Sequence, residues 1–266
     1  MGVLTPAQAL SLYTGANPFE SIAALRASNY SGSLNGALVR LLDWREPSAK
    51  AKLADGAFRA FLNSNRFSCV AAKAAIASGG YRFGYYRGFE STARTEGLAR
   101  DLAAFVAERP SMPVTYATFV AVFEETTTGD ESWFEAALWR QLQRLAELSA
   151  AFYPWAPGRS SDPNAPDFSF SFAKQAFFVV GMHPGSSRLS RRFFLPALAF
   201  NAHDQFARAR QNGNFARIQR VVRSRELALQ GSLNPELSDF GRRTEARQYS
   251  GRTAQGEWRC PFRAPA

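Results

Sequence analysis

Short runs of aromatic and β-branched residues stand between segments of helical periodicity in this chain of 266 residues. Such runs are typical of strands, because branched and aromatic side chains pack well on a pleated surface. We expect strands in VTYATFVAVFEE at 114–125, FSFSF at 168–172, AFFVVGM at 176–182 and RRFFLPALAFNAH at 191–203. The last run contains Pro196, which predicts an edge position or a break in that strand. The stretch YRFGYYRGFE suits a strand or an irregular loop.

The other structured segments place apolar residues three and four positions apart, as helices do. Helices are expected at 18–25, 34–42, 55–62, 68–80, 92–108, 133–152 and 204–225, the last one interrupted near QNGN. PWAPGRSSDPNAPD at 154–167 predicts an exposed loop, which is either a domain boundary or a long connection inside one domain. We therefore predict an α+β fold in a single domain over 1–266. Its N-terminal half is helical, with a small, mainly antiparallel sheet, flanking helices and an irregular tail from Gly231.

Composition excludes several classes of protein. Hydrophobic residues make up 46% of the chain, and 23 of them are Phe, which is unlike a disordered or collagen-like chain. The chain has no run of about 18 apolar residues, so no membrane-spanning helix is predicted. MGVLTPAQALSLYTGANPFE lacks the charged and apolar regions of a secretory signal. The only cysteines, Cys69 and Cys260, are too few for a secreted disulfide scaffold, so we expect a cytoplasmic protein.

The net charge of +10 comes from 28 arginines and 4 lysines against 22 acidic residues. From Met182 to Ala266 there are 15 arginines, no lysine and 6 acidic residues, a local charge of +9. A basic surface of this kind attracts nucleic acid, anionic lipid or an anionic ligand. An equally good interpretation is that most of these arginines lie on solvated helix faces, where other proteins have lysine.

Both histidines follow an apolar, strand-like run: His183 in VVGMHPGSSR and His203 in ALAFNAHDQF. If the two strands end on the same side of a sheet, both imidazoles lie at one rim. Neutral imidazole is a common iron ligand and a common acid–base group, although a single histidine is more often a hydrogen-bonded structural residue.

The surroundings of the histidines suit a flat, apolar, anionic cofactor. Arg188, Arg191 and Arg192 could pair with carboxylates, and nearby phenylalanines supply apolar surface: Phe177, Phe178, Phe193, Phe194 and Phe200. An ordinary aromatic core with a solvated arginine face fits the same composition. One cysteine could instead supply a thiolate to iron. We find no Walker loop, GxGxxG, HExxH or GxSxG motif.

Three blocks in the last ninety residues resemble the YqcI/YcgG family in order and spacing: FVVGMHPGSSRLSRRFFLPALAFNAHDQF, GSLNPELSDFGRRTEARQYSGR and EWRCPF. A looser resemblance lies at 67–75, where the family has a Phe-Pro-Cys-like entry into an Ala/Lys helix. The chain has FSC, NPEL and AHDQF where the family pattern has FPC, NPML and PHDQF. These differences concern the identity of the substrate more than the class of protein.

Family members in guanitoxin and D-cycloserine biosynthesis are haem-dependent N-hydroxylases of arginine-like substrates. The resemblance therefore implies haem b, O₂ or peroxide, an electron donor, and oxidation of a nitrogen, with L-arginine to N-hydroxy-L-arginine as the first reaction to test. It implies an axial histidine, with His183 preferred and His203 as the distal hydrogen-bond donor, or the reverse. Arg188 and Arg192 would contact the propionates, and Phe178 would contact the ring.

An arginine-like substrate also needs an anionic and a cationic anchor. Glu245 is the expected acid, Arg252 or Arg247 the expected partner of the substrate carboxylate, and Tyr249 or Asn234 the orienting groups. Each of these could instead make a structural contact. A haem-binding sensor or carrier and, less favoured, a basic nucleic-acid-binding protein are the alternative functions. We expect no nucleic-acid or membrane partner, and either a monomer or a homodimer.

Overall fold

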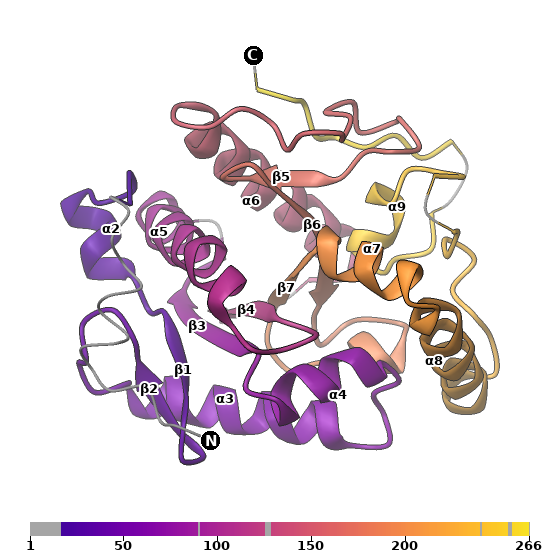
Figure 1. The fold of residues 1–266 in the computed structure, drawn as a ribbon, viewed down its shortest axis with the longest axis horizontal. Helices are drawn as coiled ribbons and strands as arrows, with labels where there is room; N and C mark the ends of the chain where they lie inside the picture. Colours follow the sequence, from indigo (N-terminus) through magenta and orange to yellow (C-terminus); the bar gives the residue numbers. More distant parts are fainter. Residues whose placement is uncertain (1–16, 90, 126–128, 240, 255–256, 266) are drawn as a thin grey trace.

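The computed structural model describes residues 17–89, 91–125, 129–239, 241–254 and 257–265. Most of the N-terminal segment inspected for a secretory signal lies outside these residues. Within them, seven strands form one sheet in the order β2-β1-β3-β4-β7-β6-β5 (Figure 1). The strands are β1 Ser31–Leu34, β2 Ala37–Arg40, β3 Tyr81–Arg87, β4 Thr118–Glu124, β5 Phe170–Phe172, β6 Gln175–Met182 and β7 Ala197–Ala202. Only β3 and β4 pair in parallel. The predicted α+β class with a mainly antiparallel sheet is confirmed.

Helices cover both faces of the sheet. They are α2 Ile22–Ala27, α3 Ala49–Asn63, α4 Val70–Ala77, α5 Thr92–Glu108, α6 Glu131–Ala150, α7 His203–Gln211, α8 Asn214–Gln230 and α9 Ala246–Tyr249, with short 3₁₀ turns η1 Arg109–Ser111 and η2 Leu189–Arg191. Alternate residues of each strand enter opposite cores, because strand side chains have a period of two. On β4, Phe119 packs in the core with α5 and α6, while Val120 packs in the core with α3 and α4.

The prediction of a helix at 34–42 is wrong, because β1 and β2 form a hairpin there. Asn35 and Gly36 connect the strands and have positive φ angles of 51° and 83°. A two-residue turn with both φ angles positive matches the right-handed twist of a hairpin, and Asn-Gly is the pair that best tolerates it. The N-terminal half is therefore less helical than expected and contains four of the seven strands.

The expectation that both histidines lie at one rim of the sheet is also wrong. Strands β6 and β7 are antiparallel neighbours, with Phe177 opposite Ala202 and Met182 opposite Ala197. His183 follows Met182 and His203 follows Ala202, so the two imidazoles lie at opposite ends of the strand pair. Five residues of extended chain separate these ends by about 17 Å. One haem therefore does not have these two histidines as axial ligand and distal donor.

Pro196 marks a break and not a sheet edge. It stands immediately before β7, which lies between β4 and β6 inside the sheet. The carbonyl oxygen of Pro196 accepts a hydrogen bond from the Phe123 N–H at 2.9 Å. Proline has no N–H to donate, so β7 begins only at the next residue, Ala197.

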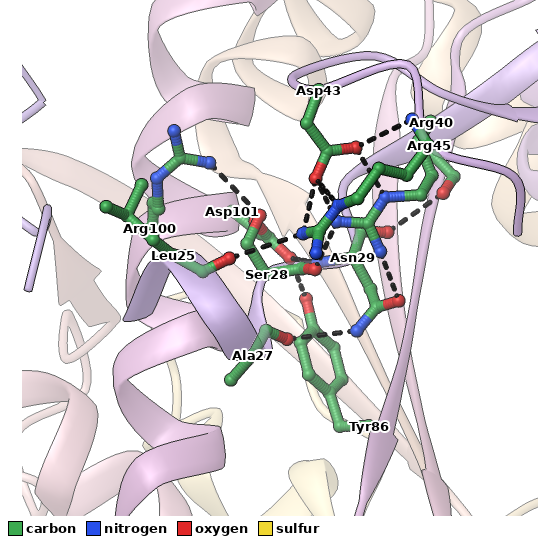
Figure 2. Close-up of polar contacts among 11 residues, drawn as sticks. Leu25, Ala27, Ser28, Asn29, Arg40, Asp43, Arg45, Tyr86, Arg100 and Asp101 are labelled. Atoms are coloured by element: carbon green, nitrogen blue, oxygen red, sulfur yellow. Dashed lines mark hydrogen bonds and ion pairs between the residues drawn. The ribbon is translucent and has the colours of Figure 1, made fainter. Parts of the chain in front are cut away.

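A buried polar network joins α2 and the hairpin to α5 and β3 (Figure 2). The Asp101 carboxylate accepts hydrogen bonds from Ser28 Oγ (2.5 Å), the Asn29 N–H (2.6 Å) and the Tyr86 hydroxyl (2.6 Å). Arg40 donates to the Ser28 carbonyl and pairs with Asp43. Because Asp101 is fully buried, these bonds replace the water that its carboxylate loses on folding.

In the described part of the chain, none of the helices combines the length and the apolar character needed to cross a bilayer. Both cysteines are free thiols. The 154–167 segment is irregular, and Trp155 packs against Phe168 and Phe262. The tail is irregular apart from α9.

Candidate functional site

One face of the sheet is incompletely covered where β6 and β7 meet. Phe178 and Val180 of β6 and Asn201 of β7 are only partly buried, although neither strand is the last in the sheet order. Strand β5 pairs with β6 only as far as Phe177. Central strands are normally buried on both faces once helices pack against them. These residues therefore mark a hollow between the sheet and the helices that cover it.

Two cavities occupy this hollow. The first, of about 220 Å³, lies between Phe178, His203 and α8, where Ile218 and Val222 line it. The second, of about 200 Å³, lies between the sheet and α3 and α4; its wall includes Phe58, Leu62, Phe67, Cys69, Ala72, Val180, Ala199 and Asn201. Phe178 and Phe206 line both cavities, so their rings form the partition between them. The hollow is an apolar slot divided by two aromatic side chains.

A buried cluster of His203, Glu245 and Tyr249 lies at the first cavity. His203 Nε2 is 2.9 Å from Glu245 Oε1 and 3.1 Å from Ser169 Oγ. The Tyr249 hydroxyl donates to Glu245 Oε1 at 2.5 Å and accepts from the Phe170 N–H at 3.1 Å. Burial and the neighbouring carboxylate of Glu245 raise the pKa of Tyr249 well above its usual value, so its hydroxyl keeps its proton. The cluster orients the imidazole and fixes which nitrogen bears hydrogen.

Local sequence explains how these side chains meet. Strand β7 runs directly into α7, so His203 is both the residue after the strand and the first residue of the helix. Glu245 and Tyr249 are four residues apart at the short helix α9, which places them on one face of that helix. The structure thus brings together three residues that the sequence predicted at the iron or the substrate: His203, Glu245 and Tyr249. Phe178 is in edge contact with the rings of His203 and Tyr249.

Three arginines lie at the first cavity: Arg210, Arg223 and Arg243. Arg223 forms an exposed ion pair with Asp239 at 3.3 Å, and Arg243 pairs with Glu236 at 2.8 Å. The guanidinium of Arg210 lies 4.9 Å from the centre of the Phe215 ring. Burial, with the nearby charge of Arg159, lowers the pKa of Arg210. Sequence analysis missed all three as site residues, because the arginine-rich helix gave no indication of which arginines face a cavity.

His183 has a different environment. It is 1% exposed, stacks on Phe134 at 4.3 Å between ring centres, and lines neither cavity. Burial lowers the pKa of His183 to about 4, so it is neutral near pH 7. Among the described residues its Nδ1 has no hydrogen-bond partner. Gly181 lets α6 pack closely on β6 and does not make room for a cofactor. A Cβ at this position would lie 2.7 Å from the ring of Phe134, a residue of α6.

The two arginines expected at the propionates are held by other groups. Arg188 is buried, pairs with Glu226 at 3.1 Å, and donates to the Ser232 carbonyl at 2.5 Å. Arg192 is exposed and donates to the Ser186 carbonyl at 2.7 Å. Neither lines the two cavities.

Arg252 and Arg247, expected at the substrate carboxylate, and Asn234, expected to orient the substrate, hold the C-terminal tail instead. Arg252 pairs with Glu135 at 2.8 Å, and Arg247 pairs with Glu236 at 2.6 Å. Asn234 donates to the Gly251 carbonyl at 3.0 Å. The structure therefore does not bring these three side chains to the cavity that Glu245 lines.

Cys69 and Asn201 belong to the second cavity. Burial raises the pKa of the Cys69 thiol, which keeps it protonated and makes it a poor ligand. The Asn201 side-chain amide lies in a mostly apolar wall, which Thr118 and Gln205 also line, and donates to the Phe178 carbonyl at 3.3 Å. An asparagine inside a predicted strand was the one sequence signal for this wall, and sequence analysis did not use it.

Helix α8 covers the first cavity, and Glu226 is its one buried residue. Glu226 accepts from Ser68 and pairs with Arg188, which joins α8 to the chain before α4 and before η2. Burial raises the pKa of Glu226, but the hydrogen bonds from Ser190, Ser68 and Arg188 outweigh it and hold the pKa below its usual value. Both ends of α8 are glycines in the left-handed region, Gly213 and Gly231.

Glu226→Gln should loosen α8 and lower the free energy of unfolding by about 2–4 kcal/mol, because it leaves the Arg188 guanidinium buried without its carboxylate. Hydrogen exchange of the α8 amides should accelerate more than exchange in α5. The double variant Arg188→Met/Glu226→Gln should recover part of the loss, since it removes the unpaired charge. Equal exchange of α8 in wild type and Glu226→Gln would contradict the role of this contact.

The fold and its site define an α+β protein with a buried His–Glu–Tyr cluster beside a divided apolar hollow. Among the described residues, no three His, Cys, Asp or Glu side chains are grouped as a metal site would need. Residues 58–263 match the YqcI/YcgG family, and the chain belongs to that family. Comparison with curated proteins and with solved structures gave no match.

Proposed function

We propose that this protein binds haem b in the divided hollow, with His203 as the iron ligand, and hydroxylates a nitrogen of an amino acid or guanidine. The observation that carries the proposal is the position of His203. It is the histidine at the wall of an apolar cavity, and its Nε2 is held by a carboxylate. Metal-bound imidazoles commonly use their second nitrogen in this way. Nδ1 would then be the coordinating atom.

The donor set and the lining suit such a cofactor. Phe178 and Phe206 offer apolar surface, and Arg210 and Arg223 offer positive charge for propionates. Each cavity alone is smaller than ordinary ligand pockets, which hold about 300–1,000 Å³. A macrocycle therefore needs both volumes, which requires Phe206 or Phe178 to move from the partition. His183 and Cys69 are less suitable ligands, since His183 is stacked inside the core and the Cys69 thiol stays protonated.

Bound haem would supply the oxidising chemistry, in which one oxygen atom of O₂ enters an N–H bond and the other leaves as water with two electrons and two protons. The residues of the chain do the rest. Glu245 and Tyr249 hold the proton at Nε2 of His203 and keep its ring oriented. The phenylalanines keep water from the reacting atoms. With peroxide as the oxidant, no external electrons are needed.

The positive charge at the first cavity suits the α-carboxylate of an arginine-like substrate. Whichever of Arg210 and Arg223 does not pair with a propionate could pair with this carboxylate. It would replace Arg252 and Arg247 in this role, because those two side chains hold the tail. Glu245, the expected guanidinium anchor, would hold the imidazole of His203 instead. L-arginine is the first substrate to test. The two free thiols are consistent with a cytoplasmic protein.

An optical spectrum of freshly purified protein and a pyridine haemochrome assay test the cofactor. We expect a Soret band and close to one haem per chain. Incubation with L-arginine, O₂ and a reductant should then give N-hydroxy-L-arginine by mass spectrometry, in amounts that depend on haem. Haem without turnover of amino acids or guanidines would instead indicate a sensor or carrier. Protein that stays colourless after reconstitution would refute the proposal.

A further inference from the structure

Helix α8 has one apolar and one basic side. Phe215, Ile218 and Val222 line the first cavity. Arg217 and Arg220 are exposed, and within the described residues neither forms an ion pair. The only acidic residue of α8, Glu226, is buried against Arg188. The outer face of α8 therefore carries two arginines, Arg217 and Arg220, for which the described residues supply no ion-pair partner.

An exposed leucine accompanies these arginines. Leu227 lies on the same side of α8 as Arg217 and Arg220 and is 48% exposed. A mixture of arginine and exposed apolar side chains is typical of protein interfaces. Nucleic-acid surfaces depend chiefly on contacts to phosphate and gain little from leucine. The composition of this surface favours an acidic protein over nucleic acid.

We propose that the outer face of α8, defined by Arg217, Arg220 and Leu227, docks an acidic protein that carries single electrons. This inference rests on the proposed function, because oxygenation with O₂ consumes two electrons that the chain does not contain. In each transfer the reduced centre of the carrier loses one electron and ferric iron of the bound haem gains it. A helix is about 10 Å across, so a carrier on this face would lie one helix thickness from the hollow.

The test compares Arg217→Glu/Arg220→Glu with a control of equal charge change, Arg26→Glu/Arg263→Glu. Arg26 lies on α2, on the opposite side of the molecule from α8 (Figure 1), and both control residues are exposed. The probe is a reduced plant-type [2Fe–2S] ferredoxin, an acidic one-electron carrier. Binding is measured by calorimetry at low and high salt, and reduction of the haem by stopped-flow absorbance. Dithionite, a small reductant that needs no docking surface, is the reference.

At low salt the α8 variant should bind ferredoxin at least about tenfold more weakly than wild type. Reduction of its haem by ferredoxin should be slower by a similar factor. The control variant should resemble wild type, and dithionite should reduce all three proteins equally. Equal ferredoxin binding by wild type and the α8 variant would overturn the proposal, as would equal losses in both variants. Tighter binding of a single-stranded DNA oligonucleotide than of ferredoxin, abolished by the same α8 substitutions, would overturn it in favour of nucleic acid.

If the protein takes up no haem, the proposed function fails, and the calorimetric comparison still decides the surface. Ferredoxin binding that only the α8 variant loses would then support an acidic protein partner. Binding that is absent in wild type would overturn it.

Discussion

His203→Ala should lose haem almost completely, with affinity lowered more than about 100-fold, because the variant removes the iron ligand itself. His183→Ala should keep the wild-type Soret band, since His183 lies at the other end of the β6–β7 pair. Glu245→Gln should fall between them, with haem affinity lowered about 10- to 100-fold, because the imidazole keeps its position but loses its carboxylate partner. Titration of reconstituted protein with haem, followed at the Soret maximum, measures all three.

His203→Ala also leaves Glu245 buried without its imidazole partner, so loss of haem could follow from misfolding. Added imidazole separates the two causes. It should enter the space that the side chain vacates and restore the Soret band of a correctly folded His203→Ala protein. The ligand assignment is wrong if His203→Ala keeps the wild-type spectrum while His183→Ala loses it.

The parts of the fold that the sequence predicted well have strong local patterns. The helix expected at 92–108 has those bounds in α5. The run at 114–125 contains β4, and β6 begins one residue before the run at 176–182 and ends with it. The helix has apolar residues at helical spacing over its whole length, and the two strands are continuous apolar runs rich in β-branched and aromatic residues. The hairpin at Asn35–Gly36 was missed because a short apolar stretch was given helical periodicity and the turn signal between its halves was overlooked.

The site divides in the same way. The sequence marked His203, Glu245 and Tyr249 individually, and Glu245 and Tyr249 are close for a local reason, since four residues make one helical turn. The misplaced rim of histidines had a non-local cause. Whether two strands run parallel or antiparallel depends on the path of the chain between them, which residue types at the strand ends do not report.

Apart from Asn201, the hollow has no signature in the sequence. Phe178 and Val180 have the pattern of an ordinary buried strand, and the positions of α3, α4 and α8 leave them partly uncovered. The roles of the arginines were hidden for the same reason. Arg188 was expected at a cofactor and pairs with Glu226, while Arg210 and Arg223 were part of a uniform basic helix and line the cavity.

Asp101→Ala should lower the free energy of unfolding by about 3–5 kcal/mol, because three buried donors lose their shared acceptor. These donors are Ser28, the Asn29 N–H and Tyr86, so the loss separates α2 and the hairpin from α5. Urea unfolding measures the change. Arg45→Ala is the matched control, since Arg45 is exposed on the same network (Figure 2) and its surface ion pair with Asp43 contributes at most about 1 kcal/mol. A loss no larger than that of Arg45→Ala would refute the anchoring role of Asp101.

The same carboxylate makes a prediction for pH. Burial raises the pKa of Asp101 to about 6, against the hydrogen bonds from Ser28, Tyr86 and the Asn29 N–H, which lower it. A raised acid pKa stabilises the fold most below the pKa of the unfolded chain, near 3.8, and that contribution is lost as pH rises to about 6. Asp101→Asn does not titrate, so from pH 4 to pH 7 wild type should lose about 2 kcal/mol relative to it. Parallel stability curves for the two proteins over this range would show that Asp101 titrates as it does in the unfolded chain.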